Sequence, residues 1–207
     1  MKKYRHWLFI AAVVILPLSV FAIVKWYEIK FTKLPVLGGE QHRIANFHLW
    51  DQHGAAASLK CWDNKIVVAD FFFTRCPVVC PKMTRSLKKV QGVFIKDKDL
   101  LISSFTVDPE SDSVGRLQQY AAKTDIHGNW LLLTGDKKEI YRLARKSFLV
   151  TATDGDGGPN DFIHSELLIL IDKKHRIRGF YNGTLPSEVD ELIRDIERLK
   201  KESSLPD

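Results

Sequence analysis

Apolar residues follow two alternating patterns along the middle of the chain. Continuous apolar runs of strand length lie at residues 66–73, 100–107 and 130–134. Such runs predict strands that are covered on both faces of a sheet. After each run, apolar residues recur every three or four positions, over residues 83–94, 114–121 and 140–148. This spacing predicts amphipathic helices, so strands and helices alternate along the chain.

A β-hairpin is predicted at each end of this alternating segment. At the amino-terminal end, Phe47 and Leu49 form one arm, and the second arm lies near residues 57–59. At the other end, residues 167–171 and 177–181 pair, and Ser187 then caps a last helix. This order of elements predicts an α/β fold, specifically a thioredoxin-like fold with an N-terminal β-hairpin extension.

The amino-terminal segment predicts a membrane anchor. Residues 7–24 carry no charge, and as a helix they would span about 27 Å, close to the roughly 30 Å of a hydrocarbon core. We therefore expect a cytoplasmic tail at residues 1–6, a single transmembrane helix at 7–24, a tether at 25–40 and the folded domain at 41–202. A cleaved signal peptide is the alternative, although the only small-residue cleavage candidate, Val20-Phe21-Ala22, lies within the apolar run.

The sequence gives only weak indications of the side of the membrane on which the folded domain lies. Three basic residues precede the apolar run and three follow it closely, so the positive-inside rule scarcely decides the orientation. The very short amino-terminal tail favours a domain on the periplasmic, non-cytoplasmic side. An accessible cysteine pair agrees with that side, because disulfides persist in oxidising compartments.

Composition and charge argue against nucleic acid as a partner. The chain of 207 residues is 45% hydrophobic and 27% charged, which is globular composition. Its formal charge is +6, of which +4 lies in residues 1–40 and only +2 in residues 41–207. The nearly neutral body lacks the electrostatic footprint of a nucleic-acid-binding domain.

Cys76 and Cys80 form the strongest candidate site. They lie between a predicted strand and a predicted helix, in Thr-Arg-Cys-Pro-Val-Val-Cys-Pro at residues 74–81. Ligands of open α/β sheets bind beyond the carboxyl ends of strands, and the amides at a helix start favour thiolate. Pro81 biases Cys80 away from a regular helix, so we expect an irregular turn that presents both sulfurs to solvent.

The spacing of this pair favours metal binding over thiol exchange. Redox centres usually have two residues between the cysteines, whereas this pair has three. Two thiolates suit Cu(I), and a third ligand would have to come from elsewhere, most plausibly an imidazole. Of the seven histidines, His164 precedes a strand at the position that faces the cysteine turn in a thioredoxin-like fold. From the pattern alone, an isolated histidine there is more often structural, so both interpretations stay open.

Taken together, these residues resemble the Sco/SenC family of copper chaperones for cytochrome oxidase assembly. The resemblance covers residues 40–185. It rests on Phe-x-Leu-x-Asp-x-x-Gly at 47–54, Asp-Phe-Phe-Phe-Thr-x-Cys-Pro-x-x-Cys-Pro at 70–81, Val-Asp-Pro-Glu-x-Asp at 107–112, Leu-Thr-Gly at 133–135, and His164 before a strand. The motif at 70–81 is specific, whereas the hairpin motif is shared with peroxiredoxins.

The resemblance implies a site and a set of partners. In that family both motif cysteines and the later histidine bind Cu(I) or Cu(II), which corresponds here to Cys76, Cys80 and His164. The implied function is delivery of copper to a cytochrome oxidase copper centre, received by the copper-bearing subunit or by another copper chaperone. Oxidation to a Cys76–Cys80 disulfide would abolish the site, so a thiol reductant is a further expected partner.

Four features depart from the family pattern or have a simpler interpretation. Val78 stands where many members have Asp, and Cys61 is an extra thiol that we expect to be unpaired. Asp108 matches a family position, yet it could equally cap the turn after its strand. The acidic residues Asp154, Asp156 and Asp161 invite a calcium interpretation, but Gly158 stands where the third acid of an EF-hand would lie, so we predict a loop.

Two enzymatic functions compete with copper delivery. A thiol–disulfide oxidoreductase of this fold carries a proline directly before the strand opposite its active site. Here that stretch reads Phe-Ile-His-Ser at 162–165, and the nearest proline is Pro159. A peroxidase would need Pro-x-x-x-Thr-x-x-Cys, which the chain lacks. The oxidoreductase therefore stays the alternative, and both roles could coexist.

Overall fold

The computed structural model describes residue 7 and residues 13–24, 33–150 and 165–204. Contacts divide the chain into two units, Met1–Leu34 and Pro35–Asp207. In the first unit, residues 13–24 are helical and exposed. No helix within the described residues is both long enough and apolar enough to cross a membrane. Because residues 8–12 lie outside the described residues, the anchor at 7–24 stays a prediction.

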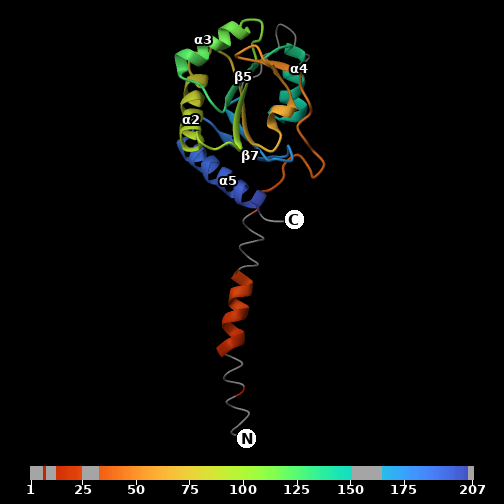
Figure 1. Cartoon of the computed structure of the whole chain (residues 1–207), viewed down its shortest axis with the longest axis vertical. Coiled ribbons are helices and arrows are strands. Elements are labelled where there is room, and N and C mark those ends of the chain that lie inside the picture. The colour runs from red at the N-terminus through yellow and green to blue at the C-terminus, as the bar shows by residue number, and fades with distance from the viewer. Residues whose placement is uncertain (1–6, 8–12, 25–32, 151–164, 205–207) are drawn as a thin grey trace. The chain divides into compact units, whose positions relative to one another are not determined.

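The second unit is built on one seven-stranded mixed sheet (Figure 1). Its strands are β1 (Leu49–Asp51), β2 (Ala56–Ala57), β3 (Ile66–Phe72), β4 (Leu100–Thr106), β5 (Trp130–Thr134), β6 (Leu167–Ile171) and β7 (Ile177–Asn182). They are arranged in the order β2-β1-β5-β4-β3-β6-β7. The central strands β5, β4 and β3 run parallel, whereas the hairpins β1–β2 and β6–β7 are antiparallel edges. This confirms the predicted α/β architecture with a hairpin at each end.

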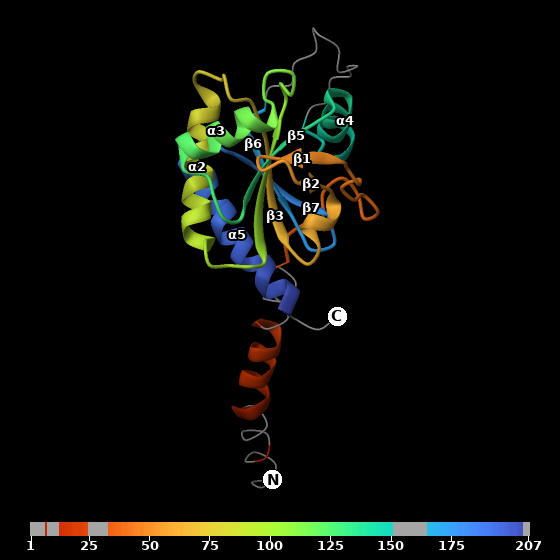
Figure 2. The ribbon, with the colours of Figure 1, turned by 45° about the horizontal axis from the view of Figure 1, so that its top comes forward.

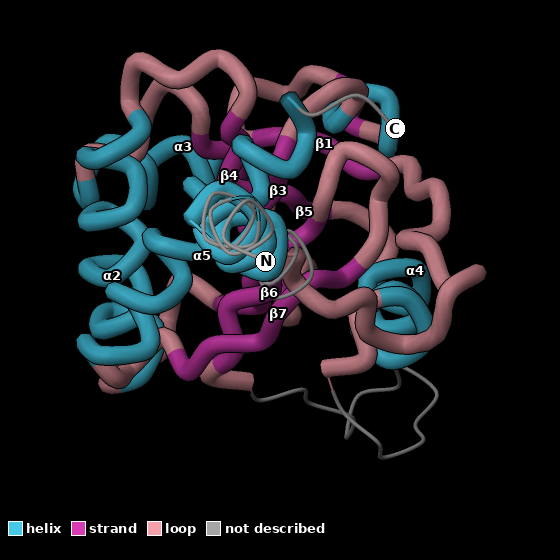
Figure 3. The backbone as a smooth tube through the Cα atoms, turned by 90° about the horizontal axis from the view of Figure 1, so that it is seen from below, coloured by secondary structure: helices cyan, strands magenta, loops and turns pink. Residues whose placement is uncertain are grey.

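Helices cover both faces of the sheet. They are α2 (Val79–Phe94), α3 (Val114–Thr124), α4 (Lys137–Arg142), which continues as the π-helical η2 (Leu143–Ser147), and α5 (Pro186–Ser204); a short 3-10 helix, η1, spans Leu59–Trp62. In Figures 2 and 3, α2 and α3 lie on the opposite side of the sheet from α4. Helix α5 packs against α2, β3 and β7.

The alternation of side chains along β3 separates two halves of the core. Val67, Ala69 and Phe71 face the cluster that contains α4 and η2. There the rings of Phe47, Trp62, Phe71, Phe105 and Phe148 pack with centroids 5.2–6.3 Å apart. Such aromatic pairs add about 0.5–1.5 kcal/mol each beyond the burial of their area. The residue between Ala69 and Phe71, Asp70, therefore points to the other face, on which α2 packs.

Some element boundaries differ from the prediction. Helix α2 begins at Val79, so Cys80 and Pro81 belong to its first turn. A proline is tolerated there because the amides of a first turn have no partner within the helix. Helix α5 begins at Pro186, one residue before the predicted cap Ser187. Leu37, in the segment assigned to the tether, forms a bridge with Ile177 of β7.

Candidate metal centre

A buried carboxylate fixes the turn that leads from β3 to the cysteines. Asp112 is 0% exposed. It accepts hydrogen bonds from the Thr74 amide at 3.0 Å, the Thr74 hydroxyl at 2.5 Å and the Thr106 hydroxyl at 2.6 Å. The loop between β3 and Cys76 is thereby tied to the end of β4. In the sequence Asp112 appeared only as the last residue of the motif at 107–112, and the next residue, Ser113, caps α3.

Asp108 has a separate role in the same region. One of its carboxylate oxygens lies 2.7 Å from the Arg75 guanidinium, which also donates to the Ser111 hydroxyl at 2.6 Å. The hydrogen bond and charge of Asp108 raise the pKa of Arg75 above its usual value. Asp108 thus holds the residue before Cys76 in place, beyond its predicted role at the turn.

The two cysteines have different environments. Cys80 is 5% exposed, whereas Cys76 is partly exposed. The prediction that both sulfurs face solvent is therefore wrong for Cys80. The reason is that Cys80 lies within α2, on the same buried side as Met83 and Leu87. The Cys80 amide donates a hydrogen bond to Cys76 Sγ at 3.3 Å, which makes the pair one compact turn.

These environments separate the acidities of the two thiols. Partial burial acts to raise the pKa of Cys76, but hydrogen bonds from Cys80 and from the amides of Val78 and Val79 outweigh it, so the pKa falls below its ordinary value. Burial raises the pKa of Cys80 to about 12, and the neighbouring Cys76 and Asp70 act in the same direction. Cys76 is therefore the thiol that ionises first.

Both cysteines line a pocket of about 450 Å³, which we call the cysteine pocket. Its other lining residues are Phe71, Phe73, Pro77, Val78, Val79, Val107, Ser165 and Glu166. The walls are mostly apolar, and the pocket opens to solvent on the side of Val78, which is 58% exposed. Ser165 brings the start of the β6 segment into the same pocket as the two sulfurs.

The other candidate metal ligands lie outside the part of the chain that the structure describes. His164, Asp154, Asp156 and Asp161 all lie outside the described residues. Within the residues that the structure describes, no three His, Cys, Asp or Glu side chains form a group that could hold a metal ion. Cys61 is a free thiol packed against the aromatic half of the core. The described part of the site is thus a pair of sulfur donors.

Sequence reasoning missed a buried acid on the same face of the sheet as α2. Asp70 is 2% exposed and accepts a hydrogen bond from the Ser104 hydroxyl, which in turn accepts one from the Trp130 indole at 2.8 Å. Burial raises the pKa of Asp70 to about 7, although the hydrogen bond from Ser104 opposes the shift. A single acid within the apolar run Ile-Val-Val-Ala-Asp-Phe-Phe-Phe was the signal that could have revealed it.

Comparison with known proteins places this arrangement in context. The family model described as SCO1/SenC matches residues 37–201. The SCO1 protein homolog of Bacillus subtilis (strain 168) is 31% identical over 176 residues, which cover 81% of this chain and 91% of that protein.

Solved structures of Sco proteins are also similar to this chain. BsSco, described with a disulfide switch and as a member of the Sco family of cytochrome c oxidase assembly proteins, is 29% identical with a TM-score of 0.68 and covers 81% of this chain and 97% of its own. ScoI of Bradyrhizobium japonicum, solved with copper bound, is 27% identical with a TM-score of 0.61 and covers 75% and 98%.

Proposed function

The chain belongs to the SCO1/SenC family, and from that premise we propose that it binds copper through Cys76, Cys80 and His164 and serves cytochrome c oxidase assembly. One observation carries the proposal. Both sulfurs line the cysteine pocket together with Ser165, the residue that follows His164 in the chain. Neighbouring Cα atoms are about 3.8 Å apart, so the third ligand is one step along the chain from a wall of the pocket.

The donor set suits a soft ion. Thiolates and imidazole favour Cu(I), and two sulfurs with one nitrogen give a three-coordinate site. Metal binding requires deprotonated thiols. Cys76 supplies a thiolate readily, because hydrogen bonds lower its pKa. Copper has to displace the proton of Cys80, whose pKa burial raises to about 12. Binding therefore releases a proton from Cys80 and strengthens as the pH rises.

The exposure of Cys76 provides a route for delivery. An incoming thiol of an acceptor can approach copper from the side of Cys76, while Cys80 is shielded within α2. Ligand exchange then passes the ion to the copper-bearing subunit of the oxidase or to another copper chaperone. In this proposal residues 7–24 anchor the protein in a membrane, with the domain on the periplasmic side.

Copper(I) titration in competition with a chromophoric chelator tests the proposal on the full chain. We expect one ion per chain, and for each of Cys76→Ser, Cys80→Ser and His164→Ala a loss of affinity at least as large as the about 10–100-fold that losing a hydrogen-bond partner of a metal ligand costs. Cys61→Ser and His53→Ala are the matched controls and should bind as the wild type does. Unchanged binding by the variants of all three proposed ligands would end the proposal.

A thiol–disulfide oxidoreductase is the second candidate. It is favoured by the contrast between Cys76, whose pKa is lowered, and Cys80, whose pKa is raised to about 12. An exposed thiolate beside a buried thiol is the arrangement that an attacking and a resolving cysteine need. Metal-free turnover of a protein disulfide that survives His164→Ala would favour this function over copper delivery.

A further inference from the structure

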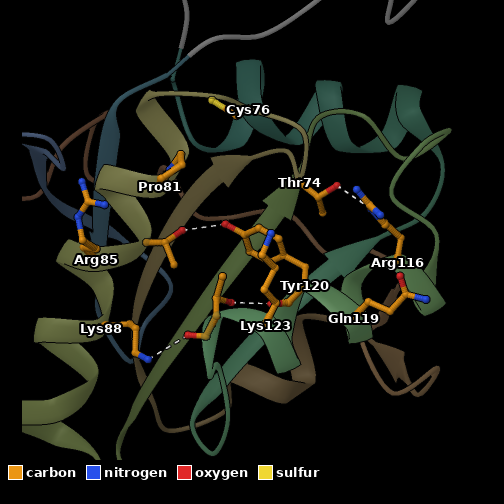
Figure 4. A pocket seen from close by; sticks show the side chains of 11 residues that line it. Thr74, Cys76, Pro81, Arg85, Lys88, Arg116, Gln119, Tyr120 and Lys123 are labelled. Atoms are coloured by element: carbon orange, nitrogen blue, oxygen red, sulfur yellow. Dashed lines mark hydrogen bonds between the residues drawn. The ribbon is translucent and has the colours of Figure 1, made fainter.

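Cys76 also lines a second pocket, of about 540 Å³, between α2 and α3, which we call the basic pocket. Its other lining residues are Thr74, Pro81, Thr84, Arg85, Lys88, Arg116, Gln119, Tyr120, Lys123 and Thr124. Four of these side chains are cationic and none is acidic. Figure 4 shows Cys76 at one end of the group and Lys88 toward the other, so the positive charges extend away from the sulfur.

Most of this charge is not neutralised by the protein. Lys88 is the exception, because it pairs with Asp125 at 2.9 Å. Arg85, Arg116 and Lys123 form no ion pair with any residue that the structure describes. Arg116 uses Nε to donate to the Thr74 hydroxyl at 3.3 Å, which directs its guanidinium toward the loop before Cys76. Three like charges around one hollow attract anions.

The remaining walls suit an organic molecule of small size. The Tyr120 hydroxyl shares a hydrogen bond with Thr84 at 3.0 Å, and the Tyr120 ring packs on Phe72 with centroids 5.6 Å apart. Tyr120 and Pro81 thus give the pocket a rigid, partly apolar wall. The volume lies within the range of about 300–1,000 Å³ that is usual for small-molecule sites.

We infer that the basic pocket binds a low-molecular-weight thiol that carries carboxylates, and that it holds the sulfur of this thiol against a disulfide formed by Cys76 and Cys80. The inference rests on the proposed function, because it requires the two cysteines to alternate between a copper-binding dithiol and a disulfide. Arginine guanidinium groups recognise carboxylates with paired hydrogen bonds, and Arg85 and Arg116 supply two such groups.

The reaction consumes two molecules of the thiol. The first attacks Sγ of Cys76 as a thiolate; a bond forms between these sulfurs, the Cys76–Cys80 bond breaks, and Cys80 leaves as a thiolate that takes up a proton. Attack falls on Cys76 because Cys80 is only 5% exposed. The second thiolate attacks the ligand sulfur of the mixed disulfide, and Cys76 leaves. Two electrons pass to the protein, and the two ligand molecules leave joined as a symmetrical disulfide.

Reduction of the oxidised full chain by thiols of different charge tests the inference. The thiols are mercaptosuccinate and reduced glutathione, which carry carboxylates, neutral mercaptoethanol, and cationic cysteamine. Free protein thiols are trapped with a maleimide at timed intervals and counted by mass. A triple variant, Arg85→Gln with Arg116→Gln and Lys123→Gln, is compared with a control triple at exposed cations outside the pocket, Lys96→Gln with Lys138→Gln and Arg194→Gln.

The ratio of variant to wild-type rate for each thiol cancels the intrinsic reactivity of that thiol. At low ionic strength we expect the pocket triple variant to be reduced about tenfold more slowly than the wild type by both carboxylate thiols. Its rate of reduction by mercaptoethanol should change by less than about twofold. The control triple should change neither class by more than about twofold. S-methylglutathione, which has no thiol, should slow reduction of the wild type by mercaptosuccinate and leave the pocket triple unaffected.

Three results would overturn the inference: equal slowing of all thiols by the pocket triple, equal slowing by both triples, or failure of Cys76 and Cys80 to form a disulfide. Copper(I) titration of the same preparations keeps the two proposals apart. Loss of charge selectivity with intact copper binding rejects only the basic pocket as a thiol site. Charge-selective reduction without copper binding rejects only the proposed function.

Discussion

The amide of Cys80 lies 3.3 Å from Cys76 Sγ and donates a hydrogen bond to it. The backbone of the buried cysteine thereby stabilises the thiolate of the exposed one. Because the helix that contains Cys80 also buries its sulfur, one turn produces a thiol that ionises easily and a thiol that does not.

Alkylation with iodoacetamide should separate the two thiols. In a Cys61→Ser background without metal, the alkylation rate of Cys76 should reach half of its maximum below pH 9.0. This is the ordinary pKa of a cysteine, and hydrogen bonds lower the pKa of Cys76 below it. Cys80 should resist labelling at pH 8, since burial raises its pKa to about 12. Peptide mass spectrometry after timed quenching measures both rates. Equal labelling at pH 8 would contradict the assigned environments.

Val78→Asp should make Cys76 less acidic. Val78 is 58% exposed and its amide is one of the donors that lower the pKa of Cys76. A carboxylate placed there disfavours the nearby thiolate and should raise the pKa of Cys76 by about 0.5–1 unit. The pH profile of alkylation measures the shift. Val93→Asp, at a similarly exposed position later in α2, is the control and should leave the profile unchanged.

Asp70→Asn should stabilise the protein at neutral pH. The folded-state pKa of Asp70 is about 7, above the ordinary value of 3.8 for an aspartate, so the folded state binds more protons than the unfolded state between these values. The contribution of Asp70 to stability therefore falls as the pH rises from about 4 to 7. The free energy of unfolding of the variant should not fall in this way. Above pH 7 it should exceed that of the wild type by up to about 4 kcal/mol.

Urea unfolding midpoints at pH 4.5 and pH 8 measure this effect. Asp63→Asn, at an exposed position, is the control and should keep the pH dependence of the wild type. A variant of Asp70 that follows the wild-type curve across this range would show that the carboxyl group ionises normally in the folded protein.

Asp112→Ala should destabilise the domain by about 3 kcal/mol, because it leaves the buried Thr106 hydroxyl and the partly buried Thr74 amide and hydroxyl without their acceptor. It should also weaken copper binding, since the turn before Cys76 loses its tie to β4. Urea unfolding and copper titration measure the two effects. Glu110→Ala, an exposed neighbour, should change stability by less than about 0.5 kcal/mol. A stable Asp112→Ala protein would refute the anchoring role.

The sequence predicted the strands well, and the reason is burial on both faces. The run at 130–134 coincides with β5, and the run at 66–73 exceeds β3 by one residue. Continuous apolar runs bounded by polar turns leave little freedom in register or length. Helix starts were predicted less well because proline is compatible with the first turn, so Pro81 did not mark the boundary of α2.

The candidate site could be found from the sequence, but its asymmetry could not. The spacing of Cys76 and Cys80 and their place after a strand located the site. The burial of Cys80 depends on how α2 is rotated on the sheet, which spacing alone does not determine. Likewise, Asp112 lies far from Thr74 in the sequence, and only the parallel pairing of β3 with β4 brings the two together. The role of His164 stays a prediction.

Of the described residues, Cys76 alone lines both the cysteine pocket and the basic pocket. Cys76 is thus the side chain that the two pockets share. Under the two proposals made above, copper bound to Cys76 excludes attack by a carboxylate thiol, and a mixed disulfide at Cys76 excludes copper. It follows from these proposals that copper can be bound again only after the disulfide has been fully reduced.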